Sequence, residues 1–456
     1  MAVSVHEVDG KHAKVRHGGR WFGSTLVLLA LLSGAVACKG SEPDELTLQP
    51  PRAVVWRDFL GINAHFLWFE PAVYRRQMDR LQALGLQWTR LDLHWDRIEP
   101  QSGQFRWDVM DPLMAEASKR GLKMEAYLVG SAPFATSAPA GSANSDQYPP
   151  RDPAVYANTL AVLAKRYPNV QAWQVWNEPN LPSFWRPRED PAAYGRLLTT
   201  SYDVLRRQAP ERDVVLGGMA YYSQMPTRGG LMIEALASGG LYRRDVITAY
   251  HPYSLYPEGD DPAKRDFIAR VQQAHPALRN AGARRIWADE WGWSSYAGPK
   301  EEQPIIGEVG QADYVLRRLA LMSALDYDKV FLFALSDLDD RATPRDRRYG
   351  LLDEQANPKL VYAVLKRFLD VTGPKLLPGK APAQAFAMPG LIGIPWVRPD
   401  GRRLWLFWAA RPGNVRVTGV GAASLYDPVK GTRLSLGARD GGINVPVSTR
   451  LSVLEW

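Results

Sequence analysis

Residues 173–180 read Trp-Gln-Val-Trp-Asn-Glu-Pro-Asn, an apolar run that ends on an amide, a carboxylate and a proline. A short apolar run of this kind is typical of a strand that is buried on both faces of a parallel sheet. Residues 286–293 read Ile-Trp-Ala-Asp-Glu-Trp-Gly-Trp and repeat the arrangement. The two segments therefore predict strands that carry Glu178 and Glu290 at their carboxyl ends.

Similar runs recur along the chain, and together they predict strands at residues 59–63, 89–93, 123–128, 172–176, 214–217, 246–250, 285–288 and 330–335. Amphipathic segments between and after them predict helices at 73–84, 155–166, 192–208, 263–280, 311–324 and 357–369. Strands that alternate with helices in this way predict an α/β fold, specifically a (β/α)8 TIM barrel. A doubly wound sheet is the alternative, but no glycine-rich phosphate turn follows any of these strands.

The sequence pattern changes after residue 372. Alternating segments such as Arg403–Ala409 and Asn444–Leu454 are separated by turns that contain glycine, proline and aspartate. This pattern predicts a C-terminal antiparallel β-sandwich at residues 373–456. The barrel then occupies residues 57–372, and residues 38–56 form a tether and a possible strand of the β module.

The first residues have the layout of a bacterial lipoprotein signal. A basic start precedes an apolar run at residues 21–37, which ends in Ala35-Val36-Ala37 directly before Cys38. We therefore predict a signal peptide at residues 1–37, lipid attachment at Cys38, and a periplasmic or envelope protein anchored to a membrane through this lipid. The alternative is an ordinary signal peptide or anchor helix with an incidental cysteine.

Composition narrows the function further. The chain has 456 residues, 46% of them hydrophobic, with a single Cys, 16 Trp and a formal net charge of +8. One cysteine excludes a disulfide framework within the chain. No block of five or six basic residues occurs, so no nucleic-acid partner is expected. We expect a monomer, and the abundance of Trp suits binding of sugar rings as well as core packing.

Glu178 and Glu290 are the candidate catalytic residues. Active sites of such barrels lie at the carboxyl ends of the strands, where strands four and seven face each other. Two facing carboxylates can cleave a glycosidic bond, one as an acid and the other as a base or nucleophile. A separation of about 5–5.5 Å gives retention of configuration, and about 6.5–9.5 Å gives inversion.

Other candidate residues fall at or near further strand ends. Arg90 and Tyr253 are expected to donate to Glu290 and keep it ionised. Asn177 is expected to hold a sugar 2-hydroxyl. The remaining substrate-binding or supporting candidates are His94, His251, Trp176, Trp185, Trp291 and Trp293. Each alone has an ordinary structural explanation, such as an ion pair or core packing, and their common location at strand ends favours a functional role.

Metal and serine-hydrolase chemistry are not expected. His94 and His251 have no third ligand at metal spacing, and no His-Glu-x-x-His sequence is present. No Gly-x-Ser-x-Gly segment occurs either. We therefore predict no metal and no cofactor.

Asn177-Glu178-Pro179, His251-Pro252-Tyr253 and Glu290 together resemble the retaining glycoside hydrolases of clan A, most closely family 39 and its members associated with Psl-type exopolysaccharide biosynthesis. The resemblance extends to residues 51–56, 146–153, 311–318 and 371–375. It implies that Glu178 is the acid/base, that Glu290 is the nucleophile, and that the enzyme is an endo-glycosidase acting on a matrix polysaccharide of mannose, rhamnose and glucose units. One departure is Phe333, where many clan relatives carry Trp.

Three alternatives to endo-cleavage remain at this point. The first is exo-action on small glycosides. The second is a non-catalytic envelope lipoprotein that binds polysaccharide, and the third is a biosynthetic transglycosylase. The size of the products, cleavage of the cognate polymer and elongation of an acceptor, respectively, distinguish them.

Overall fold

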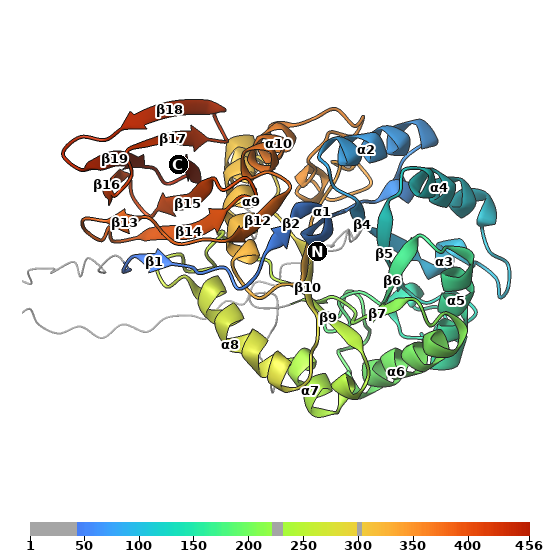
Figure 1. Ribbon diagram of the computed structural model, residues 1–456. Coiled ribbons are helices and arrows are strands. Elements are labelled where there is room, and N and C mark those ends of the chain that lie inside the picture. The colour runs from blue at the N-terminus through green and yellow to red at the C-terminus, as the bar shows by residue number, and fades with distance from the viewer. Residues whose placement is uncertain (1–42, 221–230, 299–302) are drawn as a thin grey trace, which may run out of the picture.

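The computed structural model describes residues 43–220, 231–298 and 303–456, which form a closed barrel beside a β module (Figure 1). Eight parallel strands make the barrel, and β11 pairs with β3 to close it. In order around the barrel they are β3 (Leu60–Asn63), β4 (Trp88–His94), β5 (Lys123–Val129), β6 (Val170–Val175), β7 (Asp213–Val215), β9 (Val246–His251), β10 (Ile286–Trp291) and β11 (Lys329–Leu332). The short β8 (Met219–Ala220) also pairs with β9. The predicted (β/α)8 barrel is confirmed.

Helices surround the barrel (Figure 1). The longer ones are α2 (Pro71–Ala83), α4 (Trp107–Lys119), α5 (Pro153–Arg166), α6 (Pro191–Gln208), α7 (Met232–Ser238), α8 (Asp266–Asn280), α9 (Gly307–Ser323) and α10 (Leu360–Thr372). Single turns form α1 (Trp56–Phe59) and α3 (Trp95–Ile98). Six of the helices match predicted segments, whereas α4 and α7 were not predicted.

Local sequence explains where α5 and α6 begin. Asp152 caps α5, with its carboxylate accepting a 2.8 Å hydrogen bond from the backbone N–H of Ala154. Asp190 caps α6 in the same way, accepting from Ala193 at 2.9 Å. A proline follows each cap at the first helical position, where its missing N–H costs no hydrogen bond. The start of α6 is therefore well defined, and so is the end of the loop that leads from β6 to it.

Large aromatic rings fill the barrel interior near its amino-terminal end. Trp88 lies edge-on to Trp287, with ring centroids 6.0 Å apart, and to Phe331 at 6.4 Å. A side chain at Gly61 would meet this cluster, because a Cβ atom built there lies 2.4 Å from two carbons of the Phe331 ring. The barrel is a packed core, so its chemistry is confined to the opposite rim.

The C-terminal part forms two facing antiparallel sheets, which agrees with the predicted β-sandwich. The larger contains β12 (Lys375–Pro378), β14 (Leu391–Val397), β15 (Arg403–Ala409), β17 (Ala422–Asp427), β18 (Thr432–Gly437) and β20 (Ser452–Glu455). The smaller contains β13 (Ala383–Gln384), β16 (Gly413–Thr418) and β19 (Gly442–Val447). A common apolar core includes Trp405 and Phe407 of one sheet and Val415, Val417 and Ile443 of the other.

The segment before the barrel joins the larger sheet of the module. β1 (Leu46–Thr47) pairs in parallel with β14, and β2 (Val54–Val55) pairs antiparallel with β12. The two ends of the described chain therefore meet in one sheet. Figure 1 shows α9 and α10 between the barrel and the module.

Polar contacts fasten the module to the barrel. The indole N–H of Trp408 donates to Glu258 at 2.7 Å, and the guanidinium of Arg367 donates to the carbonyls of Pro428 and Val429 at 2.8 and 3.0 Å. These groups flank an apolar core that is continuous across the boundary.

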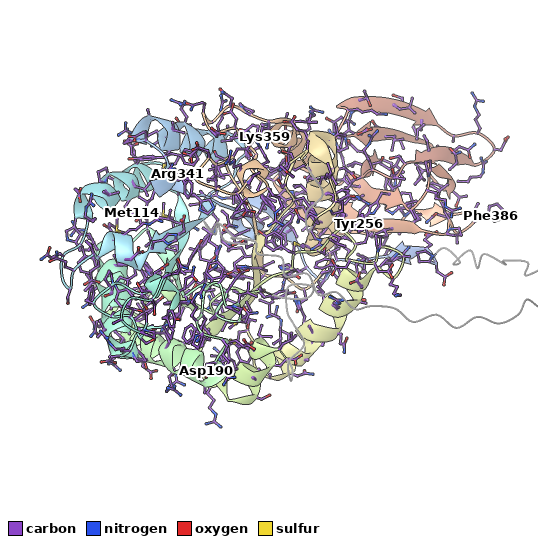
Figure 2. The ribbon with its side chains drawn as sticks, turned by 180° about the vertical axis from the view of Figure 1, so that it is seen from behind. Met114, Asp190, Tyr256, Arg341, Lys359 and Phe386 are labelled. Carbon is purple, nitrogen blue, oxygen red and sulfur yellow. The ribbon has the colours of Figure 1, made fainter. Side chains whose placement is uncertain are left out.

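At the far edge of the module, Phe386 is 81% exposed (Figure 2).

The predicted signal peptide and Cys38 lie outside the described residues. Within residues 43–220, 231–298 and 303–456, no helix is long and apolar enough to cross a membrane.

Candidate active site

Glu178 and Glu290 reach the carboxyl-terminal rim of the barrel from two different strands. Glu290 lies within β10, and Glu178 lies three residues after the end of β6. The turn that carries Glu178 is unusual, because Trp176 and Glu178 have positive φ angles of 72° and 42°. Non-glycine residues rarely adopt this region, and such strain concentrates at functional sites. Both side chains are buried.

Arg90 connects the groups at this rim. Its Nη1 atom donates to Oε2 of Glu290 at 2.9 Å and to Oδ1 of Asn63 at 2.8 Å. Its Nη2 atom donates to Oδ1 of Asn177 at 2.7 Å, and its Nε atom donates to Gln174 at 2.9 Å. The planar guanidinium fork fits four acceptors at once, so Arg90 fixes the positions of the side chains around it.

Tyr253 provides a second donor to Glu290. Its hydroxyl donates to Oε1 at 2.9 Å, and burial followed by the nearby Glu290 charge raises the Tyr253 pKa well above its usual value. Burial opposes ionisation of Glu290 itself, but the donors Arg90 and Tyr253 and the nearby His251 ring favour its charged form. These contacts suit Glu290 to the role of an ionised carboxylate.

His251 lies between the two carboxylates. Its Nδ1 atom is 2.7 Å from Oε1 of Glu178 and 3.9 Å from Oε2 of Glu290, and its Nε2 atom is 3.5 Å from Oδ1 of Asp289. Burial would lower the pKa of the imidazole, but the charges of Glu290 and Asp289 and the bonded carboxylates raise it to about 9. The surrounding carboxylates therefore favour the charged form of the imidazole.

The shared imidazole nitrogen limits the separation of Glu178 and Glu290. Their nearer oxygens can be no farther apart than the sum of the 2.7 and 3.9 Å distances, and that limit is reached only if the three atoms are collinear. Inverting pairs need about 6.5–9.5 Å for an intervening water, whereas retaining pairs lie about 5–5.5 Å apart. The geometry thus fits direct attack by one carboxylate better than attack by water.

A cleft of about 480 Å³ opens beside the pair. Three of the sequence-predicted residues border it, namely Glu290, Asn177 and His94. The His94 side chain is 38% exposed and lies 3.6 Å from Asp92. Phe333, where many clan relatives carry Trp, also lines the cleft. Sequence reasoning missed other lining residues, which include His65, Trp68, Asp92, Arg97, Tyr127, Phe184, Asp340 and Arg341.

The alternation of side chains along β4 contained a signal for one of the missed residues. Arg90, Asp92 and His94 are spaced by two, so their side chains point to the same face of the strand. Asp92 lies 2.9 Å from Nδ1 of His65, and the nearby His65 and His94 charges lower its pKa despite burial. This carboxylate therefore holds both imidazoles at the wall of the cleft.

The structure corrects the expected stacking role of the tryptophans. Trp176, Trp291 and Trp293 are at most 1% exposed, and none of them borders the cleft. Two of these rings have structural partners instead: the indole N–H of Trp176 donates to the carbonyl of Phe184, and that of Trp293 donates to the carbonyl of Ser254. Trp185 is 2% exposed and packs edge-on against Trp176. The rings of these four tryptophans therefore do not line the cleft, whose aromatic residues are Trp68, Tyr127, Phe184 and Phe333 instead.

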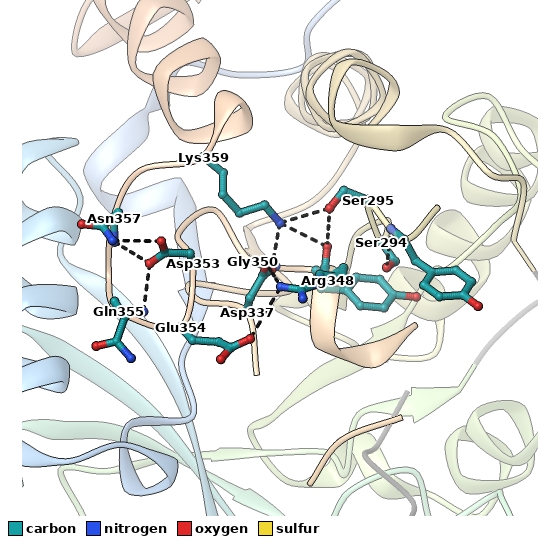
Figure 3. A network of polar contacts seen from close by, with 12 residues as sticks. Ser294, Ser295, Asp337, Arg348, Gly350, Asp353, Glu354, Gln355, Asn357 and Lys359 are labelled. Atoms are coloured by element: carbon teal, nitrogen blue, oxygen red, sulfur yellow. Dashed lines mark hydrogen bonds and ion pairs between the residues drawn. The ribbon is translucent and has the colours of Figure 1, made fainter. Parts of the chain in front are cut away.

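A polar network supports the loop after β11, which carries Arg341 and other cleft residues (Figure 3). The Lys359 ammonium donates to Asp337 at 2.8 Å and to Ser295 at 3.1 Å. Asp337 also accepts from the backbone N–H of Gly350 at 2.8 Å. Because Lys359 and Asp337 are almost completely buried, this ion pair is screened little by solvent and holds the loop in place.

Two further acidic side chains, Glu125 and Asp289, lie buried inside the barrel near Glu178 and Glu290. Neither carboxyl oxygen of Glu125 has a hydrogen-bond partner, and burial followed by the nearby Asp289 raises the Glu125 pKa well above its usual value. Asp289 lies 3.8 Å from Arg90. Burial and the neighbouring Asp289 therefore both favour the neutral form of Glu125. No group of three or more His, Cys, Asp or Glu in the described parts of the chain has a geometry that could hold a metal ion.

The architecture places the chain among (β/α)8 proteins that carry an accessory β module. It is similar to a family 39 glycoside hydrolase from Bacteroides cellulosilyticus WH2, with a TM-score of 0.68 and 19% identity over 89% of this chain and 81% of that one. It is also similar to a monomeric β-xylosidase from Caulobacter crescentus CB15, with a TM-score of 0.61 and 15% identity over 91% and 99%.

A third similar structure is a family 30 endoxylanase from Clostridium papyrosolvens C71, with a TM-score of 0.57 and 11% identity over 91% of this chain and 99% of that one. No protein-family model and no characterised protein sequence matches the chain. At these identities, the chain shares the fold of family 39 and family 30 glycoside hydrolases.

Proposed function

We propose that this protein is a retaining glycoside hydrolase in which Glu290 is the nucleophile and Glu178 the acid/base. One observation carries the proposal: two buried carboxylates lie 2.7 and 3.9 Å from the same nitrogen of His251, and one of them, Glu290, borders a cleft. A cofactor is not required, because side chains supply both the proton and the nucleophile.

The different surroundings of the two carboxylates support this division of roles. Glu290 accepts hydrogen bonds from both Arg90 and Tyr253, which stabilise its ionised form and point it at the cleft. Glu178 lies on the flanking turn and contacts His251. An ionised, well-oriented carboxylate is suited to attack, and the group opposite it must carry the proton.

The reaction follows from these positions. Glu178 gives its proton to the glycosidic oxygen while an oxygen of Glu290 attacks the anomeric carbon, so that the carbon–oxygen bond breaks and the leaving sugar departs as an alcohol. Glu178 then takes a proton from water, whose oxygen attacks the same carbon and releases Glu290. The Asn177 carbonyl oxygen accepts from Arg90, which leaves its NH₂ group to donate to the sugar 2-hydroxyl.

We further propose that the substrate is a bacterial exopolysaccharide of neutral mannose, rhamnose and glucose units, cleaved internally. The sequence resemblance to family 39 enzymes of exopolysaccharide biosynthesis supports this. The cleft also carries side chains of both signs, such as Asp340 and Arg341, so it has no strong preference for a polyanion.

Paired substitutions test the catalytic assignment. Glu290→Gln should abolish turnover, whereas Glu178→Gln should be partly rescued on aryl glycosides with good leaving groups. Departure of these groups needs no proton, but the later attack by water still lacks its base. The exposed Glu211→Gln serves as a matched control and should be unchanged. Turnover at the wild-type rate by Glu290→Gln would exclude it as the nucleophile. NMR of the first product anomer should show retention, and the inverted anomer would refute the covalent step.

Product size separates internal from terminal cleavage. The purified protein is incubated with the exopolysaccharide of the producing organism, and mass spectrometry follows the products over time. A mixture of oligosaccharides early in the reaction supports endo-action, and monosaccharides alone would indicate exo-action. Binding to the polymer without any cleavage would identify a non-catalytic binding protein, and elongated products at high acceptor concentration would identify a transglycosylase.

We also propose that lipid on Cys38 anchors the enzyme in the cell envelope. The basic and apolar residues before Cys38 support this. Metabolic labelling with a clickable fatty acid should mark the wild-type protein and not Cys38→Ser, which should also leave the membrane fraction. Equal labelling of both proteins would contradict the proposal.

A further inference from the structure

A second cavity, of about 860 Å³, lies beside the catalytic cleft. Its walls come from the loop after β5 and from the loop that continues from Glu178 to α6. Figure 2 labels Arg341, which borders the catalytic cleft, and Asp190, which borders the second cavity. None of the residues assigned to catalysis lines the second cavity.

Only a thin wall separates the two spaces. Gln147 and Phe184 border the catalytic cleft, while the next residues along the chain, Tyr148 and Trp185, border the second cavity. Arg186 closes the wall by donating from its backbone N–H and its Nε atom to Gln147, at 2.8 and 2.7 Å. The two spaces are therefore adjacent, with one hydrogen-bonded pair of residues between them.

The walls of the second cavity are held in place by hydrogen bonds. The Ser131 hydroxyl donates to the carbonyl of Tyr148 at 2.7 Å, and the backbone N–H of Ser137 donates to the carbonyl of Pro149 at 2.9 Å. On the other side, Trp185 packs edge-on against Tyr194 with ring centroids 5.8 Å apart. A site that is already ordered loses little conformational entropy when a ligand binds.

The chemistry of the lining suits neutral sugar residues. Tyr148 contributes a half-buried aromatic ring, and the apolar faces of Pro139, Pro149 and Pro187 surround it. Two basic and two acidic side chains line the cavity, so its charges balance: Arg186, Arg188, Glu189 and Asp190. Within the described parts of the chain, Arg188 and Glu189 have no hydrogen-bond or ion-pair partner. They can therefore donate to and accept from hydroxyl groups without favouring a charged ligand.

The position of the cavity indicates which end of the chain it would bind. Glu178 protonates the oxygen of the leaving sugar in the proposed reaction, and the loop that carries Glu178 continues directly into the cavity wall at residues 185–191. The cavity therefore lies on the side of the site from which Glu178 reaches the leaving oxygen.

We propose that the second cavity is a distal subsite that binds the leaving-group portion of a neutral polysaccharide, and this rests on the proposed glycosidase function. Binding energy gained there is independent of the sugar held at Glu290, so it favours long chains over short ones. The subsite thereby favours long substrates, whether the bond cleaved is internal or terminal.

The test compares substrates of different length. Aryl glycosides of single sugars end before the cavity, whereas oligosaccharides prepared by partial acid hydrolysis of the producer's exopolysaccharide reach it. Tyr148→Ala and Arg188→Ala should leave kcat/KM for the aryl glycoside within about twofold of wild type. For the longest oligosaccharides kcat/KM should fall about tenfold, which corresponds to about 1.4 kcal/mol. Tyr148→Phe keeps the ring and should retain most of the long-chain rate.

Arg196→Ala is the matched control, because Arg196 is exposed on α6 and borders neither cavity. It should match wild type on both substrates. Equal losses on short and long substrates in Tyr148→Ala, or no loss on either, would overturn the subsite.

Calorimetric binding of the same oligosaccharides to Glu290→Gln and to Glu290→Gln/Tyr148→Ala separates this proposal from the catalytic one. Weaker binding by the double variant supports the subsite even if the wild-type protein proves to have no hydrolase activity. Unchanged binding alongside wild-type hydrolysis would reject the subsite and leave the glycosidase assignment intact.

Discussion

The Nη1 atom of Arg90 lies 2.9 Å from Oε2 of Glu290, and neither side chain is more than 3% exposed. Burying an ion pair is favourable only when further hydrogen bonds satisfy the remaining groups. Here the other donors of Arg90 reach three amide oxygens, and Tyr253 donates to the second oxygen of Glu290. The pair is thus one part of a network that sets the orientation of the proposed nucleophile.

Arg90→Lys should show what this network contributes. The ammonium keeps the charge but cannot reach four acceptors in one plane, so Glu290 and Asn177 lose their common support. We expect kcat to fall by about 100-fold or more, measured with an aryl glycoside. Arg166→Lys is the control, because its pair with Asp111 is exposed and should contribute little. A wild-type kcat in Arg90→Lys would show that charge alone suffices.

Tyr253→Phe should move the acidic limb of the pH profile. Loss of the hydroxyl removes a hydrogen bond to ionised Glu290 and raises its pKa, so a higher pH is needed to ionise the nucleophile. We expect the acidic limb of kcat/KM to shift upward by about 1 pH unit. Tyr362→Phe, whose hydroxyl donates to the carbonyl of Arg80 instead, should leave this limb unchanged. A downward shift would contradict the donor role of Tyr253.

Glu125→Gln should change how stability depends on pH. Folding raises the Glu125 pKa above 4.5, so the folded protein binds a proton that the unfolded chain releases above this pH. The contribution of Glu125 to the free energy of unfolding is therefore complete below about pH 4.5, and it is lost as the pH rises through the pKa of the folded state. The free energy of unfolding should therefore fall less steeply above pH 4.5 in Glu125→Gln than in wild type. Denaturant titrations at several pH values measure this, with exposed Glu211→Gln as control. Parallel curves for wild type and Glu125→Gln would mean that Glu125 is ionised in the core.

Gly61→Ala should destabilise the barrel. The added methyl would lie 2.4 Å from the Phe331 ring, and forced overpacking costs about 1–3 kcal/mol. Urea unfolding measures the loss, and Phe331→Leu in the same chain should recover part of it. Gly437→Ala is the control, because a Cβ atom there has no neighbour within 4 Å. Equal stability of Gly61→Ala and wild type would mean that the aromatic cluster can shift.

The barrel was predictable because its pattern is local. Each of its strands is a short apolar run between amphipathic segments, and the closed barrel is the arrangement that buries both faces of every strand. Two helices escaped prediction for equally local reasons. α4 contains Pro112, which normally interrupts a helix, and α7 has only seven residues, too few to show a helical period.

The sequence by itself also determined which carboxylates reach the rim, because Glu178 and Glu290 follow or end predicted strands. It could not separate buried tryptophans from exposed ones, since a Trp in an apolar run has the same local pattern in either case. Only the tertiary structure decided that Trp291 and Trp293 are core residues, that His251 lies between the two carboxylates, and that a second cavity adjoins the cleft. These features depend on distances between strand ends and loops that are far apart in the chain, and those distances exist only once the barrel has closed.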